Sequence, residues 1–144
     1  MVISMENIFE KYKKCFLEYI QNEGNIEAAY LFGSYADHTY NENSDIDIAV
    51  IYKEDMDEYE HAGKSLDVSK IFGYIDVDYI DLKKVNVFLQ FEILKKGKLI
   101  YCENEDRLTT FMRRVQDLYI EMDYERKKYM KYVLNEEGEK YGTK

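Results

Sequence analysis

The sequence predicts an α/β (α+β) fold in which helices pack on a small mixed β-sheet. Apolar runs of strand length alternate with segments whose apolar residues recur at helical spacing, which is typical of such a fold. The 144 residues suit one core, so we expect 1–144 to form a single domain. A hydrophobic content of 46% is normal for a globular protein and argues against disorder.

The predicted elements follow one another without a repeat or linker. The first half of the chain predicts a helix at 4–21, a strand at 26–32, a short helical turn at 34–40 and a strand at 45–52. Next come a helix at 55–72, whose weaker apolar pattern includes Tyr59 and Leu66, and a strand at 74–80. The chain then predicts a helix at 85–96 closed by Gly97, a strand at 98–102 and a long helix at 106–134.

Apolar residues form a stripe along the predicted last helix. Its members include Leu108, Phe111, Met112, Val115, Leu118, Tyr119 and Met122. We expect much of this stripe to pack on the sheet, and most of the 15 tyrosines to lie in the core and its rim. Because the helix is long for so small a domain, its far end is a candidate contact for a partner.

Charge and composition exclude several classes of protein. The net charge of −9 argues against a general nucleic-acid binder, which needs a basic face. No apolar run is long enough for a transmembrane helix, and the N-terminus lacks the order of a signal peptide. Cys15 and Cys102 lie far apart, so we expect two buried free thiols in a reducing cytoplasm.

The segment 32–51 carries the chemistry. Gly33 and Ser34 follow an apolar strand, and Asp45 and Asp47 open the next one. Residues two apart on a strand share a face, so the two carboxylates project side by side and repel each other unless a cation lies between them. Mg²⁺ suits few carboxylates together with substrate phosphates, and the turn at Gly33 can bring backbone N–H groups against a phosphate. The pattern therefore predicts a site for a metal-bound nucleoside triphosphate.

This pattern resembles the nucleotidyltransferase superfamily of the DNA polymerase β type. The likeness is closest to the minimal nucleotidyltransferases (MNT), and it covers about residues 26–103 and, more loosely, the helix at 106–134. It includes the later strand Ile75–Leu82, with the sequence IDVDYIDL. The resemblance implies the nucleotidyltransferase fold with a mixed sheet.

By the same resemblance Asp78 is the third metal carboxylate beside Asp45 and Asp47. Asp76, on the same strand face two residues earlier, is the alternative ligand. Asp76 and Asp81 are otherwise expected to face solvent or to support the ligands. Ser44 either orients Asp45 or ends the loop.

The resemblance implies nucleotidyl transfer with two Mg²⁺ ions and ATP as the substrate. Asp45 and Asp47 would hold the metal-bound triphosphate, and Asp78 would face the acceptor hydroxyl. Ser34 would donate to a phosphate oxygen, and Gly33 would permit close backbone approach.

The chain departs from the family after the Gly-Ser pair. Asp37 and His38 stand where many relatives have arginine and glycine, so a basic residue that would touch phosphate is missing. Lys53 or Lys64 could substitute, and His38 could contact the nucleotide. His61 receives no role.

Proteins of this kind commonly accompany a HEPN-domain RNase toxin, and the MNT antitoxin transfers AMP to a tyrosine of that toxin. The resemblance therefore implies a cytoplasmic adenylyltransferase antitoxin, with ATP and a HEPN toxin as partners and no direct contact with nucleic acid or membrane. The alternatives are a small-molecule nucleotidyltransferase of the antibiotic type and an antitoxin that acts by binding alone. The homo- or hetero-oligomeric state stays open.

Overall fold

The computed structural model describes residues 8–36 and 45–140. The helices are α1 (Ile8–Glu23), α2 (Glu58–Ile71), α3 (Val87–Lys96) and α4 (Glu105–Lys140). The strands are β1 (Ile26–Phe32), β2 (Ile46–Tyr52), β3 (Val77–Asp81) and β4 (Lys98–Cys102), and short 3-10 turns lie at Gly33–Tyr35 and Leu82–Lys84.

The four strands form one mixed sheet in the order β3-β2-β1-β4. β1 pairs antiparallel with both β2 and β4, and β2 pairs parallel with β3 through the crossover helix α2. The predicted fold class, helices on a small mixed sheet with a long last helix, is confirmed.

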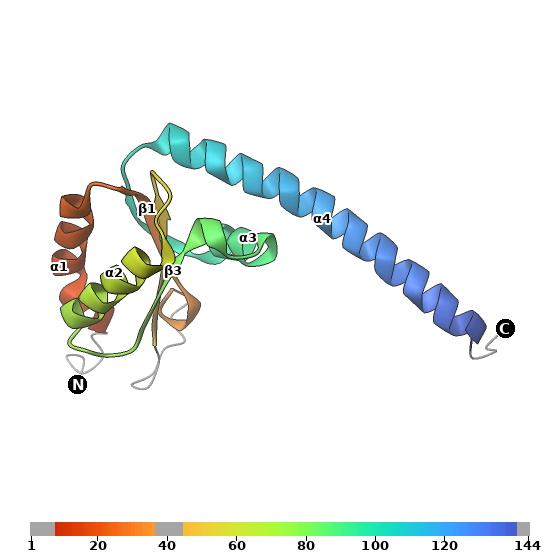
Figure 1. Cartoon of the computed structure of the whole chain (residues 1–144), viewed down its shortest axis with the longest axis horizontal. Coiled ribbons are helices and arrows are strands. Elements are labelled where there is room, and N and C mark those ends of the chain that lie inside the picture. Colours follow the sequence, from red (N-terminus) through yellow and green to blue (C-terminus); the bar gives the residue numbers. More distant parts are fainter. Residues whose placement is uncertain (1–7, 37–44, 141–144) are drawn as a thin grey trace.

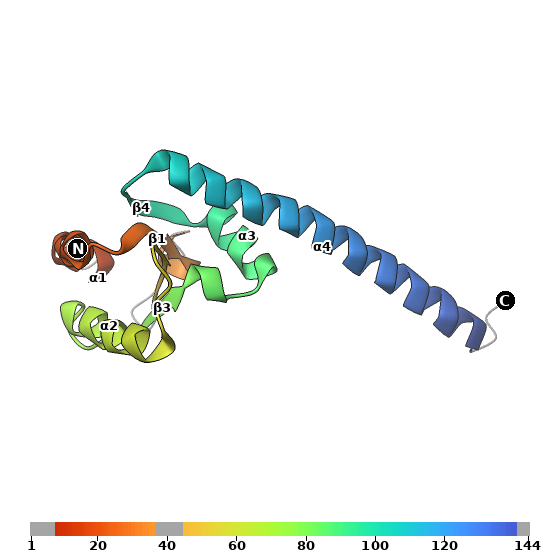
Figure 2. The same ribbon diagram turned by 45° about the horizontal axis from the view of Figure 1, so that its top comes forward.

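Helices cover both faces of the sheet (Figures 1 and 2). On one face, residues of α1 and α2 such as Phe16, Ile20 and Val68 pack against Ile48 and Val50 of β2. On the other face, α3 and the first turns of α4 pack against the alternate residues of the same strands. The strands therefore have both faces buried, and a polar residue in them needs a reason.

Side chains at the helix starts define where α2 and α3 begin. The carboxylate of Asp57 accepts a hydrogen bond from the backbone N–H of Glu60 (2.8 Å), and the amide oxygen of Asn86 accepts one from Leu89 (3.0 Å). These N-caps satisfy backbone donors that have no partner within the helix, so α2 and α3 begin two or more residues later than the sequence predicted.

The first turns of the long helix α4 pack on the sheet, and the helix then packs on α3. The ring of Tyr119 stacks on Phe91 with centroids 3.8 Å apart, and Leu108 and Val115 are buried. Beyond its last contact with α3, α4 extends alone, away from the sheet (Figures 1 and 2). The expectation that much of the apolar stripe packs on the sheet is therefore wrong for its distal members, since Met122 is 44% exposed.

Three further expectations need correction. Cys15 is exposed and Cys102 is only partly buried, so the two free thiols are not core residues. Tyr59 and Leu66 lie on the solvent side of α2, although they contributed to its apolar pattern. Asp81 is buried, because its carboxylate accepts from the backbone N–H of Lys83 (3.2 Å) and caps the following turn.

No helix in the described part of the chain has the length and apolar character needed to cross a membrane.

Candidate functional site

The turn after β1 brings backbone close to a carboxylate. Gly33 has a φ of +71°, a conformation that side-chain-bearing residues rarely adopt. A Cβ built at Gly33 would lie 2.2 Å from Oδ2 of Asp47, which is an overlap. The N–H of Ala36 donates to the carbonyl of Gly33 (3.1 Å) and closes the turn. Glycine is therefore required here both by the backbone and by the carboxylate that lies against it.

Strand register brings the aspartates together. Asp47 pairs with Phe32 of β1 on one side and with Asp78 of β3 on the other. Residues directly opposite each other on neighbouring strands project to the same face, and so do residues two apart on one chain. Asp45, just before β2, therefore projects on the same side as Asp47 and Asp78. These three carboxylates lie at one end of the sheet, next to Gly33.

The pairing of β2 with β3 also distinguishes Asp78 from Asp76, the alternative ligand. Asp76 precedes β3, and its backbone carbonyl accepts from the N–H of Ile46 (3.4 Å). The carboxylates that act on Asp47 are those of Asp78 and Asp45. The geometry thus favours Asp78 over Asp76 as the third carboxylate of the site.

The surroundings of Asp47 disfavour the negative charge on its carboxylate. Burial, together with the negative charges of Asp78 and Asp45, raises the pKa of its carboxyl to about 6. A cation bound here would offset this shift, because a nearby positive charge favours the ionised carboxylate. The electrostatics of the site therefore fit a cation-binding role.

The donor set fits Mg²⁺ in chemistry. Carboxylate oxygens are hard ligands, and Mg²⁺ is usually bound by one or two of them together with water and substrate phosphates. Within residues 8–36 and 45–140, no group of three or more histidine, cysteine or acidic side chains by itself forms a metal site. Asp45, Asp47 and Asp78 are the residues that would hold the ion with the substrate.

A cavity of about 520 Å³ adjoins the glycine turn. Its lining includes Gly33 and Ala36 from the turn and Leu89, Lys96 and Gly97 from α3 and the residue that follows it. A Cβ at Gly97 would come within 2.5 Å of the carbonyl oxygen of Ile93, so glycine permits the close turn into β4. The hydroxyl-bearing Ser34 lies in the same turn and is partly buried.

Lys96 is the basic residue that the sequence reasoning missed. Lys53 forms an ion pair with Glu103, and Lys64 forms one with Glu23, both away from the aspartates. Lys96 instead lines the cavity beside Gly33, with its ammonium 3.3 Å from the exposed carboxylate of Glu92. The sequence signal that could have indicated Lys96 is its position at the end of a predicted helix, directly before Gly97. Asp37, His38 and Ser44 lie outside the described residues.

His61 has a structural position on the opposite face. One ring nitrogen lies 2.8 Å from the hydroxyl of Tyr52, and the other donates to the carbonyl of Tyr79 (2.8 Å). The ring also stacks on Tyr79, with centroids 5.3 Å apart. His61 thus ties α2 to β2 and β3 behind the aspartates, a role that only the tertiary structure reveals.

Comparison with known proteins agrees with this geometry. The family model "Polymerase beta, Nucleotidyltransferase" matches residues 14–106. The chain belongs to this nucleotidyltransferase family. The match includes β1, the glycine turn, both aspartate-bearing strands and α3, so it covers every element of the site.

Within this nucleotidyltransferase family the chain resembles a protein adenylyltransferase. It is 31% identical over 81 residues to the protein adenylyltransferase MntA of Shewanella oneidensis, a match that covers 56% of this chain and 58% of that relative. The chain therefore spans less than two thirds of the length of the curated relative it matches.

Two solved structures share the nucleotidyltransferase fold over most of their length. One is described as a toxin–antitoxin with AMP-PNP; it is 26% identical with a TM-score of 0.72 and covers 85% of this chain and 98% of its own. The other is a tri-AMPylated Shewanella oneidensis HEPN toxin in complex with an MNT antitoxin; it is 23% identical with a TM-score of 0.68 and covers 89% and 99%. At 23% identity, the similarity to this second structure shows a shared fold and nothing more.

Proposed function

We propose that this protein is a metal-dependent adenylyltransferase antitoxin that transfers AMP from ATP to a tyrosine of a HEPN toxin. The observation that carries the proposal is the position of Asp47, between Asp45 and Asp78 and against the backbone of Gly33. Carboxylates that destabilise one another beside an exposed glycine turn suit a metal-bound triphosphate. The likeness to MntA supports the protein acceptor.

The transfer joins the phenolic oxygen of the acceptor to the α-phosphorus of ATP and breaks the bond from that phosphorus to the oxygen bridging to the β-phosphate. Diphosphate leaves, and the phenolic proton passes to a nearby base. Asp45, Asp47 and Asp78 would hold Mg²⁺ together with the substrate, and the ion would supply positive charge against the charge that develops on the phosphate oxygens.

The residues of the chain divide the remaining work. Asp45 and Asp47 orient the triphosphate, while the backbone of Gly33 and the hydroxyl of Ser34 donate to phosphate oxygens. Asp78, exposed on the neighbouring strand, faces the acceptor and is placed to receive the phenolic proton. Lys96, beside Gly33, adds a positive charge in place of the basic residue that the turn lacks.

The net charge and the two cysteines support the proposed class of acceptor and the proposed cytoplasmic location. A net charge of −9 suits a protein acceptor better than a nucleic acid. Both cysteines are free, which suits the reducing cytoplasm to which we assign the protein.

The test is the intact mass of a HEPN protein encoded beside this chain, after the two are produced together. We expect mass increments of one or more AMP units with the wild-type chain and none with Asp45→Ala plus Asp47→Ala. Asp76→Ala is the matched control, because it removes a neighbouring carboxylate that does not act on Asp47. This control should retain the increments.

Each other outcome points to an alternative. A tight complex without any increment would contradict transfer and identify an antitoxin that acts by binding alone. If the experiment gives no increment and no complex, the protein acceptor is contradicted. Small-molecule hydroxyl compounds would then be the next acceptors to assay. Loss of the increments in Asp76→Ala as well would contradict the assignment of Asp78.

A further inference from the structure

A second groove lies at the end of the sheet opposite the aspartates. β2 runs from Ile46, next to Asp47, to Tyr52, so its far end lies about 17 Å from Asp47. There a cavity of about 340 Å³ opens between the sheet and the first turns of α4. A neighbouring cavity shares Lys83, Phe111 and Arg114 with it, so the two form one groove along α4.

The groove has more basic than acidic side chains, although the chain is acidic. Four basic side chains line its two cavities, together with the acidic side chains of Glu27, Asp55 and Asp106. The basic residues are Lys53, Lys83, Arg107 and Arg114. Lys53 is neutralised by Glu103, but neither Lys83 nor Arg114 has a side-chain partner among the described residues. An anion would therefore find unpaired charge here.

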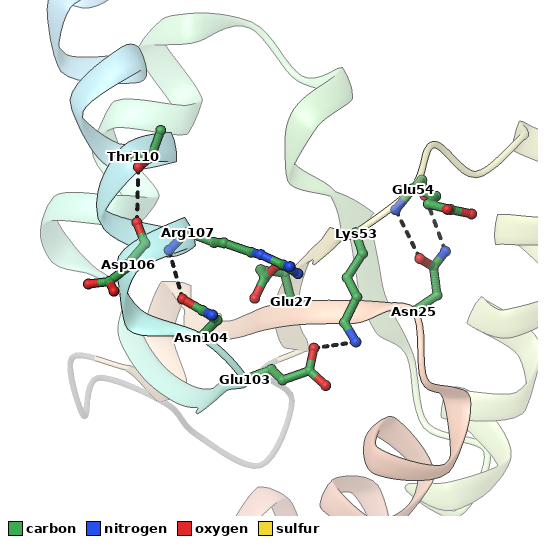
Figure 3. A network of polar contacts seen from close by, with 9 residues as sticks. All are labelled: Asn25, Glu27, Lys53, Glu54, Glu103, Asn104, Asp106, Arg107 and Thr110. Atoms are coloured by element: carbon green, nitrogen blue, oxygen red, sulfur yellow. Dashed lines mark hydrogen bonds and ion pairs between the residues drawn. The ribbon is translucent and has the colours of Figure 1, made fainter.

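A buried acid, Glu27, lies in the same groove (Figure 3). Its residue is 6% exposed, and the pairing of β1 with β2 shifts between Ile26 and Ala28, so Glu27 is the extra residue of a β-bulge. Such a bulge redirects a side chain. Here the carboxylate lines the cavity together with Arg107.

The carboxylate of Glu27 is incompletely satisfied. Its Oε1 lies 3.5 Å from Nη1 of the mostly exposed Arg107, and its buried Oε2 has no hydrogen-bond partner in the described part of the chain. Buried polar atoms in native proteins normally have partners, and an ionised carboxylate only accepts hydrogen bonds. The missing partner is therefore a donor.

We propose that this groove binds a phosphate monoester that carries hydroxyl groups, the class to which nucleoside monophosphates belong. The phosphate lies against Lys83, Arg107 and Arg114, whose donors suit phosphate oxygens. A ligand hydroxyl donates to Oε2 of Glu27. The site is separate from the transfer reaction, because none of the residues that line it lies beside Asp47, Asp78 or Gly33.

The test is a titration of the full, ¹⁵N-labelled chain with AMP, with inorganic phosphate and with adenosine, in the presence of EDTA. Without a divalent ion the three aspartates repel phosphate, so binding in the groove is read separately from binding at the aspartates. We expect saturable shifts of the backbone amides of Glu27, Ile51 and Thr110 with AMP, and weaker binding of the two fragments.

Variants separate a built site from nonspecific attraction. Lys83→Ala plus Arg114→Ala should weaken AMP binding by at least about tenfold, because both charge-assisted contacts are lost. Both residues are exposed, so the fold should tolerate the change. Arg113→Ala, an exposed neighbour on α4 that does not line the cavity, is the matched control and should leave the affinity unchanged. Glu27→Gln should reduce the preference for AMP over inorganic phosphate.

Several results would overturn the assignment. These are absence of saturation, shifts confined to the neighbourhood of Gly33 and Asp78, an equal effect of Arg113→Ala, or equal affinity for inorganic phosphate and AMP. None of them bears on adenylyl transfer to a toxin, which the mass experiment decides on its own.

Discussion

Asp47 carries its negative charge where the fold disfavours it. Its carboxylate lies against the glycine turn, partly buried, with Asp78 opposite and Asp45 beside it. The free protein is therefore less stable with Asp47 ionised than with Asp47 neutral, and a bound cation would remove that cost. A cation bound at the candidate site would thus stabilise the folded protein through Asp47.

Replacement of Asp47 by asparagine tests this cost. The pKa of the carboxyl is raised from 3.8 to about 6, so its ionisation lowers the free energy of unfolding as the pH rises through that window. With EDTA, Asp47→Asn should be more stable than wild type by about 1 kcal/mol above pH ~6, after allowance for solvent screening, and the difference should disappear below pH ~4. Urea unfolding across this range measures it.

Asp76→Asn is the control for that measurement, because Asp76 is exposed and does not act on Asp47. Its stability should follow wild type at every pH. A wild-type protein more stable than Asp47→Asn above pH ~6 in EDTA would contradict the explanation, because the linkage requires the opposite sign.

Gly33→Ala should abolish activity and lower stability. The added Cβ overlaps Oδ2 of Asp47 and also forces alanine to adopt a φ of +71°. Gly24→Ala is the matched control, because Gly24 has a similar φ of +78° but no atom within 4 Å of a built Cβ. The control should cost about 1 kcal/mol from backbone strain alone, and Gly33→Ala clearly more. Equal losses in urea unfolding would contradict the contact with Asp47.

At the scale of elements, the sheet is organised around β1 and β2. β1 supplies the glycine turn at one end and the bulged Glu27 at the other, while β2 presents Asp47 to one face and packs Ile48 and Val50 on the other. α3 covers the face that bears the aspartates and holds α4 through aromatic contacts. α4 therefore supports the helix that lines the candidate site.

Tyr119→Ala tests that support. The ring of Tyr119 stacks on Phe91 at 3.8 Å and meets Phe88 edge-on at 5.6 Å. Its loss should lower the free energy of unfolding by about 2–3 kcal/mol, a little less than for a fully buried ring. Tyr124→Ala, on the same helix and 64% exposed, is the control and should change stability by less than about 0.5 kcal/mol. Urea unfolding distinguishes them, and equal effects would contradict the packing of α4 on α3.

At the scale of the whole molecule, α4 gives the protein an elongated outline. Its 36 residues span about 54 Å, and the guanidinium of Arg126, 5.8 Å from the ring centre of Phe88, makes a late contact with the rest of the protein. Exposed apolar side chains continue beyond it, including Tyr129, Met130 and Leu134. A helix segment without tertiary packing is marginal in water, so this part of α4 should open more readily than the rest.

Hydrogen exchange measures this difference. Amides of residues 128–134 should exchange faster than those of residues 108–119 by at least about tenfold, because local opening there breaks no tertiary contact. A stop codon after residue 127 should leave the melting temperature within about 2 °C of the full chain. Uniform protection along the isolated chain's α4 would contradict the extended arrangement.

The sequence was sufficient where the signals are local. β1 and β4 match the predicted ranges of 26–32 and 98–102, because apolar runs bounded by glycine and polar residues define short strands. Prediction was weaker at α2, whose solvent side carries Tyr59 and Leu66 and whose only buried member is Val68. A helix that packs near the edge of a sheet needs only a narrow apolar stripe. Few apolar residues then recur at helical spacing, so the sequence pattern of such a helix is weak.

By itself, the sequence determined the order of the elements. It also placed Gly33 and Ser34 in a turn and Asp45 and Asp47 on one side of a strand, because turn preferences and strand alternation depend on near neighbours. Only the tertiary structure placed Asp78 rather than Asp76 beside Asp47 and buried Asp81. It also gave His61 its two hydrogen-bond partners and pointed the side chain of Glu27 into the groove beside α4. Strand register, bulges and helix docking depend on residues distant in the chain, which local patterns do not encode.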